Sequence, residues 1–236
     1  MWVAGGAILL LLGFVVGTAA VLSWWNGPAP GPGYVRLSED EVAATTARAA
    51  EVGAELDAWW EVQIAEHSQA WRFLPVGDRL TDGDDGVPCD GKAVVPDDDL
   101  LDNAWAAMCD EGPVVAFDPA TFRGSDIALQ VILAHEWGHV GQALDRRLDE
   151  IEVDPDAPYA ETELQADCYA GAWAATGMSA DDRELAVLEL RAIGDPPSVP
   201  QDDPDGHGTA DEREAAFRLG VEGGITACLP ANFDAR

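Results

Sequence analysis

Basic side chains are scarce in this 236-residue chain, and their scarcity excludes one class of partner. Lysine and arginine together number 13 against 44 aspartate and glutamate residues, and the formal net charge is −31 at pH 7. A field of this sign repels the phosphates of nucleic acids, so nucleic-acid binding is excluded. Hydrophobic residues make up 47% of the chain, which excludes an intrinsically disordered protein and favours a folded domain.

Charged side chains are absent from residues 1–25. As a helix this apolar segment would be about 36 Å long, enough to cross a bilayer core of roughly 30 Å. Trp2 and Trp24 lie near its ends, where tryptophan is enriched in membrane helices. No basic region precedes the segment, so we expect an uncleaved transmembrane anchor in preference to a cleaved signal peptide. Residues 26–34, rich in proline and glycine, form the expected tether, and residues 35–236 the folded domain.

Cysteine pairs of the C-x-x-C type are also absent, which argues against a zinc ribbon or finger. The chain has four cysteines, and an even number after an apolar N-terminal segment favours two disulfides in an oxidising compartment. Cys89 and Cys109 bracket a segment that such a bond would close into a loop. We therefore expect the folded domain to lie on the extracytoplasmic side of the membrane.

Strand patterns are few, so we predict an α+β fold that is mainly helical and contains a small sheet. Val114–Asp118 is the clearest strand, and the proline that follows ends it. The segment from Leu74 to Pro113 is expected to be a loop. Capping residues and apolar periodicity predict helices over about residues 39–73, 126–147, 162–176, 180–193 and 210–219.

Histidine is scarce, and two of the four histidines lie in one short motif. His135 and His139 frame H-E-W-G-H, a pattern that arises by accident in roughly one such sequence in a few hundred. On a helix these two residues lie about 40° apart, so both rings reach one point, which Glu136 borders. The set is typical of catalytic zinc, with the histidines as ligands and Glu136 as the base for the bound water. His67, alone in its segment, is expected to be a surface or packing residue.

A catalytic zinc needs a third protein ligand, and two segments offer one. The metzincin pattern would use Asp145, but a glutamine replaces its required glycine, so the helix continues and Asp145 points away. The second segment, E-L-Q-A-D-C, puts Glu163 and Asp167 on one face of the next helix and resembles the gluzincin arrangement. That resemblance implies Glu163 as the third zinc ligand. It also implies that Asp167 holds the second ring nitrogen of His135, in preference to His139.

The motifs H-E-W-G-H, E-L-Q-A-D-C-Y-A-G-A-W and H-G-T-A-D-E-R, with a cysteine near the C-terminus, resemble the neutral zinc metallopeptidase family. The resemblance covers about residues 109–228. It implies a zincin-like domain that hydrolyses peptide bonds in a peptide or protein substrate with a zinc-bound water. It also implies a disulfide between Cys168 and Cys228, which leaves Cys89 with Cys109.

The roles of several other polar residues stay open. His207, which opens H-G-T, is a candidate to stabilise the oxyanion, or it is a loop residue that positions Thr209. Arg213 could take either part or pair with an acid, and Tyr159 is a lesser candidate. By analogy with other zincins, the strand at Val114–Asp118 is expected to accept the substrate as an added strand.

The sequence therefore predicts a single-pass, membrane-anchored zinc metallopeptidase. An alternative of a different class is a catalytically inactive, zinc-stabilised binding module at the membrane surface. Glu136 argues against that alternative, because a purely structural zinc site needs no base. A metal-free structural domain is the remaining hypothesis, and it would bind no zinc.

Overall fold

The structure is a computed structural model of the chain, and it describes the folded part in several stretches. They are residues 37–63, 72–75, 87–89, 92–94, 104–109, 112–117, 119, 122, 124–148, 159–200, 203, 206–229 and 233. The predicted anchor at residues 1–25, the tether at 26–34 and His67 lie outside these stretches. No helix within them is long and apolar enough to cross a membrane.

Within these stretches the fold is α+β and mainly helical, as predicted. The helices are α2 (Glu39–Gln63), α3 (Asp126–Leu148), α4 (Tyr159–Gly177), α5 (Ala180–Ala192), α6 (Ala210–Gly223) and α7 (Ile225–Cys228). The strands are β1 (Arg72–Pro75), β2 (Val87–Cys89), β3 (Lys92–Val94), β4 (Ala104–Cys109) and β5 (Gly112–Phe117). The predicted helices correspond to α2 through α6, whereas the short α7 was not predicted.

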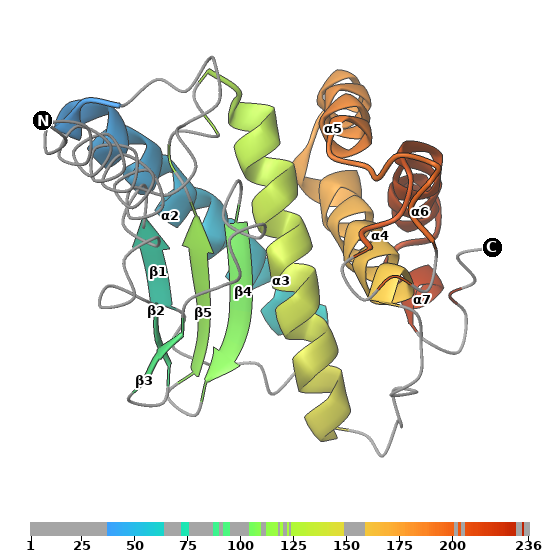
Figure 1. The fold of residues 1–236 in the computed structure, drawn as a ribbon, viewed down its shortest axis with the longest axis horizontal. Helices are drawn as coiled ribbons and strands as arrows, with labels where there is room; N and C mark the ends of the chain where they lie inside the picture. The colour runs from blue at the N-terminus through green and yellow to red at the C-terminus, as the bar shows by residue number, and fades with distance from the viewer. Residues whose placement is uncertain are drawn as a thin grey trace, which may run out of the picture.

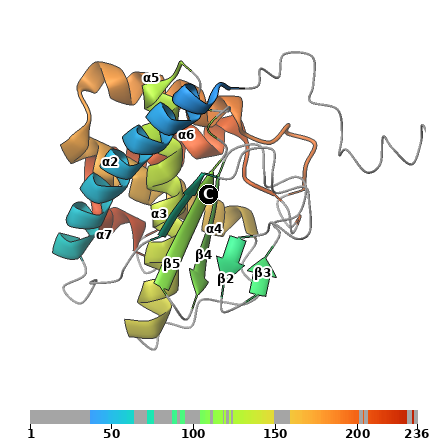
Figure 2. The same ribbon diagram turned by 90° about the vertical axis from the view of Figure 1, so that its left-hand side faces the viewer.

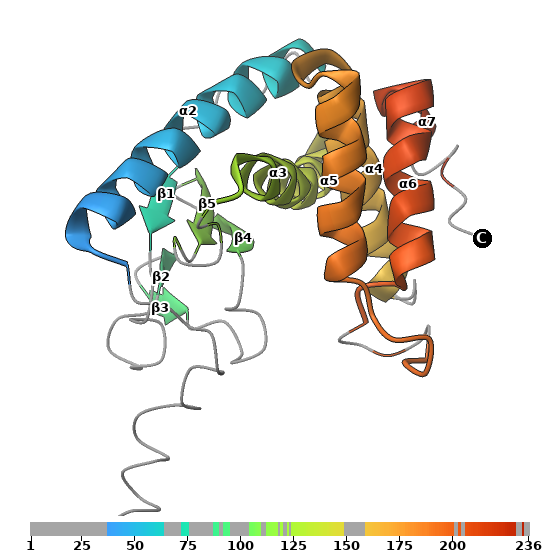
Figure 3. The same ribbon diagram turned by 90° about the horizontal axis from the view of Figure 1, so that it is seen from above.

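A three-stranded sheet forms one layer of the fold. Its order is β1-β5-β4, with β1 parallel to β5 and β4 antiparallel to it. Val115 of β5 pairs with Phe73 on one side and with Ala106 on the other. The β2–β3 pair is separate and lies across the larger sheet from α2 (Figures 2 and 3). All of residues 114–117 are buried, which indicates that β5 is covered on both faces.

Two predictions about the strands are wrong. The segment from Leu74 to Pro113 is not simply a loop, because it contains β2, β3 and β4. These strands are only three to six residues long and carry proline, alanine and cysteine, so their alternation is too brief to recognise. The strand predicted at Val114–Asp118 matches β5, but both edges of β5 are already paired. A substrate therefore cannot add to it as an extra strand.

Side-chain caps open the helices at the positions that the sequence predicts. At the start of α2 the Ser38 N–H donates to the Glu41 carboxylate at 2.9 Å, and the Glu41 N–H donates to Ser38 Oγ at 3.3 Å. The same capping box opens α6 at Thr209. The predicted helix end near Phe73 is wrong, because Phe73 pairs in β1; α2 is described as far as Gln63. Strand pairing here overrides a helical run of apolar residues.

Helix α3 lies between the sheet and a helical layer of α4, α5 and α6 (Figures 1 and 3). Trp137 of α3 is fully buried in the core between these layers. Trp60 of α2 packs edge-on against Tyr169 of α4, with 5.3 Å between ring centroids. The same indole fills the space beside Gly141 of α3. The apolar face of α3 is thereby fixed in position between the sheet and α4.

Small residues allow α4 to approach both of its neighbours closely. A Cβ at Gly138 would lie 2.9 Å from the Cα of Ala166, where α3 crosses α4. A Cβ at Gly220 would overlap the backbone carbonyl of Cys168, where α6 crosses α4. Both contacts are closer than real Cβ atoms make, so each crossing depends on its glycine. These crossings bring polar side chains of α3, α4 and α6 within reach of one another.

A disulfide fastens the C-terminal end of the fold to α4. It joins Cys168 of α4 to Cys228 of α7, with 5.6 Å between the Cα atoms, and confirms that predicted pairing. Cys89 ends β2 and Cys109 ends β4, but their side chains lie outside the described part of the structure. The bond between those two cysteines therefore stays a prediction.

Candidate metal centre

Helix α3 carries the two histidines of H-E-W-G-H on one face. Its central residues from Val131 to Val140 are buried, apart from the partly exposed His139. A histidine pair in so apolar a segment needs partners, because an unpaired polar group is costly to bury. The rings of His135 and His139 lie edge to face, 4.7 Å between centroids, and their Nε2 atoms are 3.1 Å apart.

Glu163 of α4 completes a cluster with the two histidines. Its Oε2 lies 3.2 Å from His135 Nε2, and its Oε1 lies 3.2 Å from His139 Nε2. One potential ligand atom from each residue falls within 4.8 Å of the others. The group is almost enclosed by the protein, and it could hold a metal ion.

The charges of the three side chains shift one another's pKa values. Burial alone would lower the pKa of His135, but the carboxylates of Asp167 and Glu163 outweigh it and raise that pKa to about 10. Burial likewise opposes charge on His139, whose pKa is raised by Glu163. Burial would raise the pKa of Glu163, yet the two rings hold it well below its ordinary value. Protons on the imidazoles and a bound cation would therefore compete to balance the charge of Glu163.

The second ring nitrogen of His135 is held by a buried ion pair. His135 Nδ1 lies 2.8 Å from Asp167 Oδ1. Arg213 of α6 donates from Nε to Asp167 Oδ2 and from Nη2 to Oδ1, both at 2.8 Å. Asp167 is 0% exposed and Arg213 is 2% exposed. Burial opposes ionisation of Asp167, but Arg213 and His135 keep its pKa below its ordinary value.

This ion pair decides between alternatives that the sequence left open. Asp167 contacts His135 rather than His139, and the contact with His135 was the preferred prediction. Arg213 pairs with an acid, one of its three suggested roles. Because the pair is neutral overall and inaccessible to solvent, it fixes the ring of His135 without adding net charge.

Glu136 lies beside the cluster without joining it. Its side chain is 7% exposed, and burial raises its pKa above the ordinary value. It makes no hydrogen bond or ion pair with the side chains that the structure describes. A buried carboxylate beside two histidines that could bind a metal, with no partner among the described side chains, is suited to proton transfer.

His207 is not part of the His135–His139–Glu163 group. Its backbone N–H donates to the Asp195 carboxylate, and the next residue, Gly208, has φ +83°. A Cβ at Gly208 would lie 2.8 Å from the side chain of Leu164, so this loop packs on α4 beside Glu163. The role predicted for the His207 side chain stays a prediction. Tyr159 begins α4, and its side chain lies outside the described part.

Two residues near the cluster were missed by the sequence reasoning. Gln142 Oε1 lies 3.0 Å from His139 Nδ1, and Gln142 Nε2 lies 3.0 Å from Gln165 Oε1. A signal was present, because Gln142 follows His139 by three positions and so shares its helix face. Gln165 follows Glu163 by two positions, where helical geometry gives no reason to expect a contact with the site.

The chain matches no protein-family model, no curated protein and no solved structure. The resemblance to neutral zinc metallopeptidases therefore rests on the chain's own motifs. What the structure adds independently is a group of two histidines and a glutamate that could hold a metal ion.

Proposed function

We propose that the chain is a zinc metallopeptidase of the gluzincin type with a zincin-like fold. The observation that carries this proposal is the convergence of His135, His139 and Glu163 beside the buried carboxylate of Glu136. Two imidazoles and one carboxylate are a common ligand set for catalytic zinc, which keeps a fourth position open.

The residues at the cluster fit a zinc ion in their hydrogen bonding as well as in their type. Each histidine has its Nδ1 beside a side-chain oxygen, so each Nε2 faces the other ring and Glu163. A neutral imidazole that donates through Nδ1 presents a lone pair at Nε2, which is the form that binds a metal. His135, His139 and Glu163 would thus supply two nitrogens and one oxygen.

The proposed reaction is hydrolysis of a peptide bond. Zinc, when bound, supplies a Lewis acid that acidifies a water molecule and polarises a carbonyl group. Glu136 accepts the proton of the attacking water and returns it to the leaving amine. Its burial favours this role, because a raised carboxylate pKa makes it a stronger base near neutral pH. His207 is proposed to stabilise the oxyanion.

The proposed location is outside the cytoplasm, with residues 1–25 as a membrane anchor. The disulfide between Cys168 and Cys228 supports this proposal, because such bonds persist in oxidising compartments. The proposed partners are the membrane and a peptide or protein substrate.

The test compares the full-length wild type with Glu136→Gln and with Glu161→Gln as a matched control. Glu161 is an exposed residue in the first turn of α4, so its variant makes the same charge change away from the cluster. Zinc content is measured by elemental analysis, and cleavage is measured on an unbiased peptide library. We expect about one zinc per chain in all three proteins. We expect cleavage by the wild type and Glu161→Gln, with none by Glu136→Gln.

Other outcomes would change the proposal in defined ways. Zinc without cleavage in any of the proteins would favour the zinc-stabilised binding module. Absence of zinc from the wild type would refute both zinc-dependent functions. Equal cleavage by Glu136→Gln and wild type would remove Glu136 from the mechanism.

A further inference from the structure

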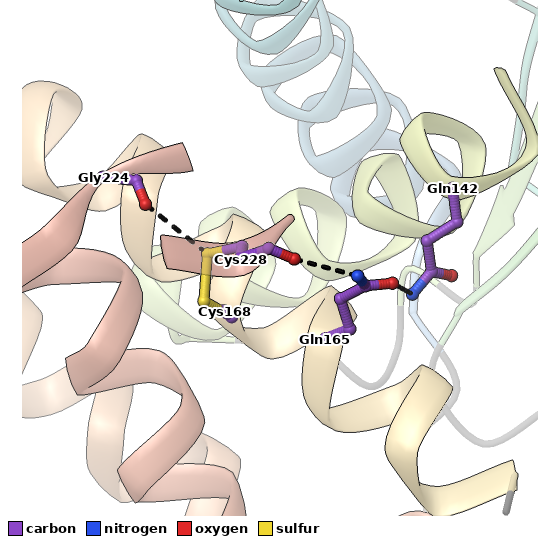
Figure 4. The surroundings of a disulfide bond; sticks show 5 residues. All are labelled: Gln142, Gln165, Cys168, Gly224 and Cys228. Atoms are coloured by element: carbon purple, nitrogen blue, oxygen red, sulfur yellow. Dashed lines mark hydrogen bonds between the residues drawn. A yellow bond between two sulfur atoms is a disulfide. The ribbon is translucent and has the colours of Figure 1, made fainter. Parts of the chain in front are cut away.

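A chain of neutral amides leads from the second histidine to the disulfide. Gln142 Nε2 donates to the Thr162 carbonyl at 2.7 Å and to Gln165 Oε1 at 3.0 Å. Gln165 Nε2 then donates to the backbone carbonyl of Cys228 at 2.8 Å. Figure 4 shows the two glutamines in line between α3 and α7, with Cys228 bonded to Cys168. We call this series, from His139 through Gln142 and Gln165 to Cys228, the amide relay.

The amide relay has only one direction, because a backbone carbonyl accepts hydrogen bonds and never donates them. The Cys228 carbonyl requires the NH2 group of Gln165, which turns Gln165 Oε1 toward Gln142. That oxygen and the Thr162 carbonyl then both require the NH2 group of Gln142. Gln142 Oε1 is left to face the histidine ring.

The consequence falls on the tautomer of His139. An amide oxygen can only accept, so His139 Nδ1 must carry the proton that it donates to Gln142. In the neutral ring the lone pair then lies on Nε2, which faces Glu163 at 3.2 Å. The relay therefore prepares His139 for a cation, as Asp167 does for His135.

The relay is also anchored at both ends. Gln142 is buried, and its two N–H groups are both used. The final acceptor belongs to Cys228, whose sulfur is bonded to Cys168 on the same helix that carries Gln165. The last link therefore spans from α4 to a segment that is covalently fastened to α4.

We propose that Gln142 is a positioning residue for metal binding at His139, and that Gln165 supports it through the carbonyl of Cys228. This inference rests on the metal centre of the proposed function. A different view is that the two glutamines only join α3 to α4. The two views differ in what happens to the ring proton of His139.

The test uses the full-length chain with zinc alone as the probe. The dissociation constant for zinc is measured by competition with a chromogenic chelator. The Nδ1–H resonances of His135 and His139 are recorded by NMR on the zinc-loaded protein. The variants are Gln142→Leu, Gln165→Leu and the double variant, with Gln130→Leu as the matched control. Gln130 lies on α3 too, but its amide binds Asp126 at the start of that helix.

For Gln142→Leu we expect zinc binding to weaken by about 10- to 100-fold, the usual effect of removing a ligand's partner. The Nδ1–H resonance of His139 should disappear through exchange with water, while that of His135 stays. Gln165→Leu should weaken binding by less, on the order of tenfold at most. The double variant should match Gln142→Leu, because both residues act through one chain. Gln130→Leu should change neither readout.

Several results would overturn the relay. One is a Gln142→Leu protein that binds zinc as tightly as Gln130→Leu, or that keeps the His139 resonance. Another is fully additive losses from the two glutamine variants, which would show independent roles. If Gln142→Leu fails to fold, Gln165→Leu decides, since an unchanged affinity there removes Gln165 from the relay. A wild type that binds zinc without cleaving peptides would refute only the proposed function, whereas one that binds no zinc would refute both.

Discussion

Both histidines of the candidate metal centre have a side-chain oxygen beside Nδ1, but that oxygen is charged for His135 and neutral for His139. His135 is held by what we call the charged arm, Asp167 with Arg213, which is inaccessible to solvent. His139, with 23% of its side chain exposed, is held by the uncharged amide relay. Both arrangements put an acceptor at Nδ1 and leave Nε2 facing Glu163. The same tautomer is thus reached with and without charge.

The difference shows what each kind of hydrogen-bond partner requires when it is buried beside a histidine. A carboxylate raises the basicity of its histidine more than an amide does, but its charge must be neutralised when it is buried. Arg213 provides that neutralisation from a third helix, α6. The relay needs no counter-charge, and it can therefore end on a neutral backbone carbonyl. The charged arm should therefore depend on its counter-charge, whereas the relay has no charge to compensate.

The largest expected effect is that of removing the counter-charge from the charged arm. In Arg213→Met the Asp167 carboxylate stays buried without compensation, which should lower the free energy of unfolding by about 3–5 kcal/mol. Denaturant unfolding of the zinc-free chain measures this. Arg218→Met is the control, because Arg218 is also on α6 but its ion pairs with Glu184 and Glu214 are at least partly exposed to solvent. Its effect should stay within about 1 kcal/mol. Equal losses in the two variants would contradict the charged arm.

The next prediction uses removal of the disulfide to distinguish the amide relay from the charged arm. The double variant Cys168→Ala/Cys228→Ala opens a loop of sequence separation 60 and should lose about 4 kcal/mol by the chain-entropy argument. Because only the relay ends on Cys228, the His139 Nδ1–H resonance of the zinc-loaded protein should weaken more than that of His135. Equal weakening of both resonances would show that the bond supports the whole site and not one arm.

A smaller effect comes from making the charged arm neutral. Adding Asp167→Asn to Arg213→Met removes the uncompensated charge, so the double variant should recover at least about 1 kcal/mol over Arg213→Met alone. Unfolding curves for the two single variants and the double variant give the coupling between the residues. A double variant that is less stable than Arg213→Met would mean that Asp167 stabilises the fold without Arg213.

The last expected effect is a difference in pH dependence between the wild type and a variant that lacks the carboxylate of the charged arm. In the zinc-free protein the pKa of His135 is raised to about 10, opposed by burial but driven by Asp167 and Glu163. A raised folded-state pKa contributes stability that is complete below about 6.5 and is lost as the pH rises toward 10. Unfolding free energies at pH 6, 8 and 10 should therefore fall in the wild type. They should fall less steeply in Asp167→Asn, and identical slopes would argue against this origin.

Much of the site could be predicted because helical geometry is local. Spacing alone puts His135 and His139 on one face of a helix, and Glu163 and Asp167 on one face of the next. The sheet was predicted poorly, since strands of three to six residues contain too little alternation and pairing partners lie far apart in sequence. The central position of β5, which rules out substrate addition there, is a property of the sheet and not of that segment.

The sequence by itself determined the chemical character of the candidate centre: which side chains are present, how they are spaced, and which helix faces they share. Tertiary structure decided which faces meet. The close approach of Gly138 to Ala166 brings α3 onto α4, and Gly220 brings α6 onto α4. Arg213 thereby reaches Asp167, and Gln142 reaches Gln165. Contacts between helices depend on crossing points far apart along the chain, so no local pattern could have specified these partners.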